Sequence, residues 1–202
     1  MVYRNTLESL RSLYAIAAPQ GGYFTAKQAA AVGYRYPHLD YHLRVGNFER
    51  VGHGLYRLPT VPPSEHDDLI RLSLWSRDRD DVPQAVLSHE SALFLHQLSD
   101  LLPHQIHLTV PRSFRKRSPK GCKLHRAELP PGDVEQRDGF AATTPLRTLK
   151  DIAEDPHVPQ EQLAKAIDDA TKRGLVRSST IKDAMERSRS SRDFIRIAAL
   201  AR

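Results

Sequence analysis

Basic, phenolic and imidazole side chains are concentrated between positions 35 and 57. Such groups donate and accept hydrogen bonds, so they can read base edges in the major groove of DNA or bind its phosphates. The candidate DNA-contacting residues of this segment are Arg35, His38, Tyr41, His42, Arg44, Arg50, His53 and Arg57. They suit that chemistry only if a helix and a hairpin present them on one surface, so the surrounding elements decide the prediction.

The pattern around these residues predicts a winged helix-turn-helix. Thr25 is a good N-cap for a short alanine-rich helix that ends at Gly33. After a turn of about four residues, a second helix is predicted over 37–45, with a proline in its first turn. Two short runs within 48–58 flank Gly52-His53-Gly54, a sequence typical of a tight hairpin turn. Helix, turn, helix and hairpin together form this motif.

The second predicted helix has two different faces. At about 100° per residue, Leu39 and Leu43 point towards a core, while His38, Tyr41 and Arg44 point the other way. A helix of this kind fits the major groove, with its hydrogen-bonding face towards the bases. Winged helices also serve as protein-interaction modules, and that alternative stays open at this point.

A second basic segment lies at 111–126 and contains seven Lys or Arg residues and no acid. Such a run is often only a solvated face, but seven like charges repel one another and favour an anionic partner. Both interpretations remain, and phosphate contact is the one that assigns a function. The residues proposed for it are Arg112, Arg115, Lys116 and Arg117.

Three other groups of residues suggest catalytic or metal chemistry, and none is convincing in the sequence. Ser88-His89-Glu90 resembles a nucleophile beside a base, but adjacent residues do not converge on one reacting atom, and Ser88 is better explained as a helix cap. His104 and His107 lack a third and a fourth ligand nearby, so the sequence predicts no metal site. Residues 133–137 lack the lysine that a metal-dependent nuclease motif needs. We therefore expect no catalytic residue, no cofactor and no enzymatic activity.

Composition is that of an ordinary globular protein. The chain has 202 residues, 40% hydrophobic and 27% charged, with a net charge of +6. The proline-rich stretch 59–64 predicts a linker between a domain at 1–61 and a second at 65–202. A single cysteine, with no long apolar run and no signal-peptide pattern, leads us to expect a cytoplasmic protein without membrane association.

The pattern along the chain predicts the α+β class, with an N-terminal winged helix-turn-helix followed by a mixed α/β domain ending in helices. A first helix is expected at 6–18, burying Leu7, Leu10, Leu13, Tyr14 and Ala17. Another helix is expected after residue 65. The expected strands are 85–87, 105–110, 122–129, 134–137 and 140–142, and helices are expected from about 144, 159, 178 and 194.

Two stretches of sequence also resemble one known family. GGYFTAKQAAAVG (21–33) and LRVGNFERVGHGLYRLP (43–59) are similar to the N-terminal domain of AbiEi antitoxins of type IV toxin–antitoxin systems. TTPLRTLKDIAED (143–155), followed by AIDDATKRGLV (166–176), is similar to the C-terminal part of the same family. The segments occur in the expected order.

The resemblance implies a DNA-binding antitoxin that represses its own operon by binding repeats in its promoter. It also implies a nucleotidyltransferase-type toxin as functional partner, and it leaves open whether the two proteins bind directly. The residues support binding to double-stranded DNA, whereas only the resemblance supports the antitoxin role. The alternatives are a winged-helix regulator without an antitoxin role and, less favoured, a nuclease-related protein.

Overall fold

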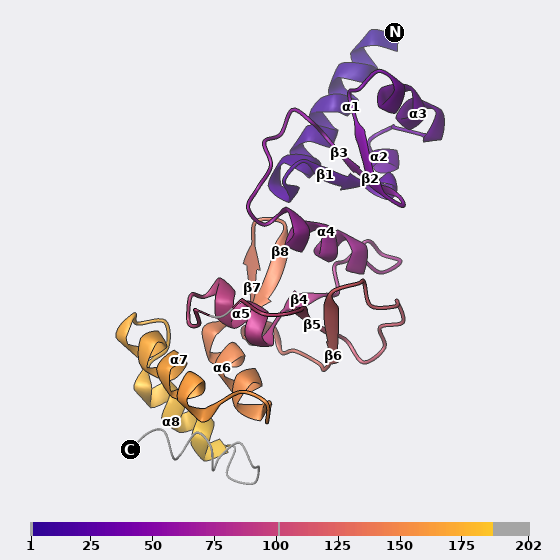
Figure 1. The fold of residues 1–202 in the computed structure, drawn as a ribbon. Coiled ribbons are helices and arrows are strands. Elements are labelled where there is room, and N and C mark those ends of the chain that lie inside the picture. Colours follow the sequence, from indigo (N-terminus) through magenta and orange to yellow (C-terminus); the bar gives the residue numbers. More distant parts are fainter. Residues whose placement is uncertain (1, 101, 188–202) are drawn as a thin grey trace. The chain divides into compact units, whose positions relative to one another are not determined.

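The computed structural model describes residues 2–100 and 102–187, so the helix predicted from 194 lies outside the described residues. The chain divides into two compact units, Met1–Gln84 with Gln136–Phe140, and Ala85–Glu135 with Ala141–Arg202 (Figure 1). Helices and two β-sheets confirm the predicted α+β class. Residues 65–84 pack within the first unit. The assignment of separate functions to 1–61 and 65–202 therefore stays a proposal.

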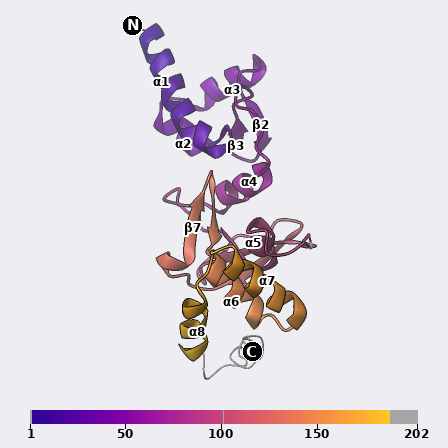
Figure 2. The ribbon, with the colours of Figure 1, turned by 90° about the vertical axis from the view of Figure 1, so that its left-hand side faces the viewer.

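The first unit contains the winged helix. Its three-stranded antiparallel sheet has the order β1-β3-β2, and Figure 2 shows α1, α2 and α3 grouped beside the strands β2 and β3. The elements are α1 (Val2–Ala17), the 3₁₀ helix η1 (Ala18–Gln20), β1 (Tyr23–Thr25), α2 (Ala26–Ala31), α3 (Tyr36–Arg44), β2 (Glu49–Gly52), β3 (Leu55–Arg57) and α4 (Asp67–Ser76). The predicted helices and hairpin are confirmed, whereas β1 has no counterpart in the sequence prediction.

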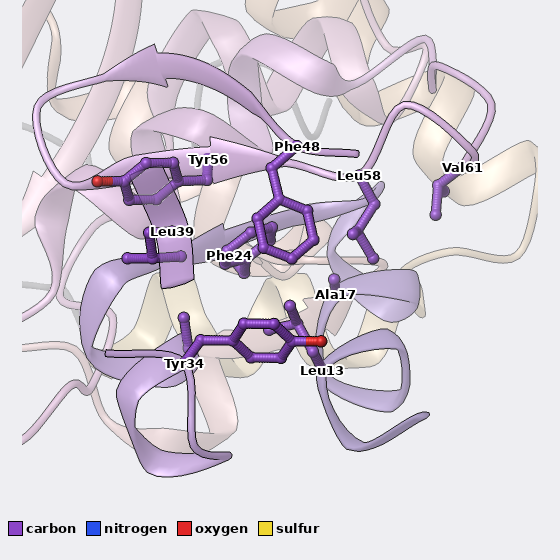
Figure 3. Close-up of a cluster of buried hydrophobic side chains, with 10 residues drawn as sticks. Leu13, Ala17, Phe24, Tyr34, Leu39, Phe48, Tyr56, Leu58 and Val61 are labelled. Atoms are coloured by element: carbon purple, nitrogen blue, oxygen red, sulfur yellow. The ribbon is translucent and has the colours of Figure 1, made fainter. Parts of the chain in front are cut away.

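Aromatic rings form the centre of this unit (Figure 3). Phe24 and Phe48 are almost fully buried, with ring centroids 5.2 Å apart in an edge-to-face arrangement. Tyr56 stacks on Phe24 at 5.7 Å, and Tyr34 meets Phe48 at 5.4 Å. Leu39 of α3 and Tyr56 of the wing strand β3 belong to this same cluster, so it fixes α3 and the wing relative to each other.

The prediction for α1 is only partly right. Leu13 and Ala17 are buried, but Leu7, Leu10 and Tyr14 are 56%, 43% and 48% exposed. The buried stripe follows a four-residue spacing through positions 13 and 17, and the other three side chains lie on the flank of the helix. The spacing of the apolar residues therefore predicted the helix correctly but overestimated the width of its buried face.

The second unit is built on a five-stranded mixed sheet of order β6-β5-β4-β8-β7. β4 pairs antiparallel with β5 and parallel with β8, and β5 pairs parallel with β6. The helices α5, α6 and α7 lie side by side (Figure 1) and share a core that includes Leu93, Leu149, Ile152 and Leu163. The elements are β4 (Val86–Leu87), α5 (His89–Leu95), β5 (Ile106–Val110), β6 (Cys122–Arg126), the 3₁₀ helix η2 (Pro131–Asp133), β7 (Val134–Arg137), β8 (Phe140–Thr143), α6 (Pro145–Glu154), α7 (Gln160–Lys172) and α8 (Ser178–Arg187).

All five predicted strands are present, although β6 ends three residues before the predicted limit of 129. The parallel pairing of β5 with β6 was not predicted. It requires the connection 111–121 to cross over without a helix, and this connection carries most of the second basic segment.

Candidate nucleic-acid interface

Local features at its N-terminus and in the preceding helix and turn position the helix α3. Thr25 accepts a hydrogen bond from the Gln28 amide, and the Gln28 side chain accepts one from the Thr25 amide, which completes the capping box of α2. Arg35 occupies the N-cap position of α3 and Pro37 lies in its first turn. Gly33, in the turn between the helices, has a φ of +99°, which a side chain would disfavour.

The outer face of α3 carries exposed hydrogen-bonding groups, as predicted from its periodicity. Leu39 is buried, while His38, Tyr41 and Arg44 are exposed. The Nδ1 atom of His38 lies 3.2 Å from the carbonyl oxygen of Gly33. A carbonyl only accepts, so Nδ1 carries the hydrogen, and Nε2 of the neutral ring is left as an acceptor.

Arg44 forms an ion pair within α3 that would have to break before its guanidinium could contact a DNA base. Its guanidinium lies 2.9 Å from the Asp40 carboxylate, and the two side chains are 72% and 53% exposed. An exposed pair of this kind contributes little to stability, so DNA can compete for the arginine at small cost. Tyr36, which was not among the predicted contacts, is the most exposed large aromatic of α3 at 78%. Its position immediately before Pro37 was the available signal.

His42 supports the helix instead of extending from it. Its ring stacks on Phe48 with centroids 4.6 Å apart, and Asn47 Nδ2 lies 3.0 Å from its Nδ1. Burial, the larger cause, and nearby His38 lower the pKa of His42, which favours the neutral ring. Among the candidate DNA-contacting residues, it is therefore a positioning residue in this structure.

On the wing, Arg50 and His53 are exposed, whereas the Arg57 side chain is mostly buried. Arg50 and His53 are exposed, and the hairpin turn is completed by Gly54 at a φ of +65°. Arg57 donates to the Val61 carbonyl at 2.7 Å, and its guanidinium lies over the Tyr23 ring at 5.7 Å. Its side chain is only 14% exposed. The geometry therefore makes Arg50 the better wing residue for phosphate contact.

In the second unit, the basic segment forms the exposed connection between β5 and β6. Phe114 is buried and anchors the connection, and Arg126 donates to its carbonyl oxygen at 2.5 Å. The charged side chains beyond this anchor are exposed, namely Arg112, Arg115, Lys116, Arg117 and Lys120. A cationic loop with an apolar anchor is suited to binding a polyanion without sequence selectivity.

The structure brings Ser88 and His89 into contact but does not form a serine triad. Ser88 Oγ lies 3.0 Å from His89 Nδ1, a contact that the sequence did not predict. His89 Nδ1 also faces Asp151 at 3.9 Å, whereas a triad uses one ring nitrogen for each partner. Ser88 is fully buried and accepts a hydrogen bond from Thr109 at 2.8 Å, and its side chain makes no helix-capping bond, contrary to its predicted role.

The two histidines first considered as metal ligands lie in different surroundings. His104 is exposed, while His107 is buried next to His89 and His125. Spacing along the sequence does not reveal this cluster, because its members lie on α5, β5 and β6.

Comparisons with known proteins agree with this geometry. Residues 11–59 match the family model described as "Transcriptional regulator, AbiEi antitoxin", which confirms the resemblance over the winged helix. A search of curated protein sequences found no match. The fold is similar to the crystal structure of RV2827C protein from Mycobacterium tuberculosis, with a TM-score of 0.53 and 19% identity, covering 96% of this chain and 80% of that one. Among the described residues, every helix is too short or too polar to span a membrane.

Proposed function

We propose that this protein is a DNA-binding transcriptional regulator that uses α3 as its reading helix and Arg50 and His53 as wing contacts. The observation that carries the proposal is the exposed face of α3, with His38, Tyr41 and Arg44 together, inside the segment that matches a transcriptional-regulator family. These groups suit base edges, whereas the wing and the cationic connection 111–121 suit phosphates. We place no catalytic step on any of these residues.

The finer role that we propose is that of a cytoplasmic antitoxin that represses its own operon. The family description names an AbiEi antitoxin, and the resemblance of 143–155 and 166–176 to the C-terminal part of that family extends the argument to the second unit. Its DNA target would be repeats in its own promoter. Its functional partner would be a nucleotidyltransferase-type toxin, bound directly or opposed without a stable complex. A regulator without a toxin is the alternative.

The cationic connection is expected to contribute phosphate contacts that increase the salt dependence of binding. Each phosphate contact adds about 0.9 to the slope of log affinity against log salt concentration, so Arg115→Gln with Arg117→Gln should lower that slope by about 1.8. The matched control is Lys165→Gln with Lys172→Gln, which removes the same charge from two exposed lysines of α7. Binding titrations at several salt concentrations measure both. If the two double variants had equal slopes, the connection 111–121 would not contact DNA phosphates.

Repression and antitoxin activity should separate between the two units. When the protein is expressed from a foreign promoter together with the toxin gene of its own operon, Tyr41→Ala with Arg44→Ala should still restore growth but no longer repress a reporter of its own promoter. The reason is that the exposed face of α3 serves DNA recognition alone in this proposal. Unchanged repression by the double variant would contradict the function proposed for α3. Loss of growth rescue by this variant, with normal folding by circular dichroism, would contradict the separation.

A further inference from the structure

Three histidines from separate elements converge in the second unit. His89 begins α5, His107 lies in β5 and His125 lies in β6. One ring nitrogen from each lies within 4.8 Å of the other two. The ring centroids of His89 and His125 are 3.5 Å apart, and that of His107 is 5.1 Å from His125.

Strand register places two of these rings on the same face of the sheet. In the parallel pair, His107 is opposite Lys123 and Thr109 is opposite His125, so His107 and His125 are diagonal neighbours on one face. Cys122 alternates to the other face, so its thiol lies outside this cluster of imidazoles. A hydrogen bond links α5 to β5: the His107 amide donates to Ser91 Oγ at 2.9 Å.

Two of the rings have buried nitrogen atoms to which no described residue gives a hydrogen bond. They are Nδ1 of His107 and Nε2 of His125, and His107 is only 5% exposed. A buried nitrogen without a partner costs free energy that a ligand can recover. The Nδ1 atom of His89 is already engaged by Ser88 Oγ, which leaves Nε2 of that ring for a ligand.

The backbone of His89 is held in an unusual conformation. Its φ is +52°, a left-handed value that is uncommon for a residue with a side chain. Conformations of this kind persist where the surrounding structure demands them, and they cluster at functional sites. Here the effect is to lay the His89 ring against that of His125.

Carboxylates surround the cluster in positions that suit metal-bound imidazoles. Glu90 Oε2 lies 3.7 Å from Nε2 of His107, and Asp151 Oδ2 lies 3.9 Å from Nδ1 of His89. Ligating histidines commonly direct their second nitrogen to such a group. Lys123 is a cation on this face. Burial lowers the pKa of all three rings, to about 3 for His89 and about 4 for His125, where the other imidazoles of the cluster are the next largest cause, ahead of Lys123.

We propose that His89, His107 and His125 form a binding site for one divalent transition metal ion of the class that imidazole prefers, with Zn²⁺ as the expected occupant. Three nitrogen ligands leave a fourth position for water or another oxygen ligand. Zinc–nitrogen bonds of about 2.0–2.1 Å place tetrahedral ligand atoms about 3.3 Å apart, so binding draws the three rings together by side-chain rotation. The ion then ties α5 to the two strands that carry the cationic connection 111–121.

The test uses the untagged full-length protein, stripped with a chelator and then titrated with Co²⁺ and with Zn²⁺. We expect one equivalent of Co²⁺ to give visible absorption bands of a tetrahedral site without a thiolate charge-transfer band, because Cys122 lies on the other face. His125→Gln and His107→Gln should weaken binding by at least the ~10–100-fold typical for loss of a group that merely orients a ligand. The matched control, His104→Gln, removes an exposed histidine outside the cluster and should bind as the unchanged protein does.

A second measurement applies even if the cluster variants fail to fold. Zn²⁺ at about 100 times its dissociation constant should raise the melting temperature of the unchanged protein by roughly 10 °C, and chelator should reverse the shift. The proposal is overturned if the unchanged protein shows no saturable one-equivalent cobalt spectrum, if a thiolate band appears, or if His104→Gln abolishes binding. It is equally overturned if folded His125→Gln and His107→Gln bind metal normally.

Discussion

Arg44→Ala is expected to lower the preference of the protein for its operator over random DNA by roughly 5- to 150-fold, the equivalent of about 1–3 kcal/mol. The guanidinium of Arg44 is exposed on the outer face of α3, and its ion-pair partner among the described residues is the exposed Asp40 on the same helix, so it is available for a bidentate contact with guanine. Titrations of both DNAs at one fixed salt concentration measure the ratio of the two affinities.

The control for this variant is Arg50→Ala on the wing. Arg50 is exposed and makes a long contact of 3.5 Å with the Gly52 carbonyl, so we expect its loss to weaken binding to both DNAs about equally. Arg57 is also a predicted DNA contact on the wing, but its bond to the Val61 carbonyl means that its removal would disturb the wing as well. If Arg44→Ala left the preference unchanged, α3 would not be the reading helix, and a protein-interaction module would be the better interpretation.

Phe24→Ala is expected to destabilise the first unit by about 3–5 kcal/mol, because a fully buried ring is replaced by a cavity. The lost ring contacts Phe48 edge to face and stacks on Tyr56, and both partners belong to the structure that supports the wing and α3. DNA binding should therefore fail at temperatures at which the unchanged protein still binds.

Urea unfolding followed by tryptophan fluorescence measures this change, because the single tryptophan, Trp75, lies in the first unit. Tyr36→Ala is the matched control, since it removes an aromatic ring that is 78% exposed and should change stability by less than about 0.5 kcal/mol. A loss below about 1 kcal/mol for Phe24→Ala would show that the aromatic cluster does not hold the winged helix together.

Local signals in the sequence determined most of the secondary structure and the candidate reading face. Thr25 with Gln28 fixed the start of α2, a proline marked the first turn of α3, and glycine marked the hairpin turn. The alternation of apolar residues located β5, and the three- and four-residue spacing separated the two faces of α3. Such signals depend on neighbours within a few residues, so they can be read without knowing the rest of the fold.

Only the tertiary structure decided which polar side chains remain available and which meet. His42 and Arg57 are residue types that commonly contact DNA. In the structure, His42 stacks on Phe48 and Arg57 donates a hydrogen bond to the Val61 carbonyl, so both are held within the unit. The histidine cluster depends on the parallel register of β5 with β6 and on the docking of α5, which join residues up to 36 positions apart, from His89 to His125. Pairing between distant segments follows from the packing of the whole unit, and no periodicity within a single segment specifies it.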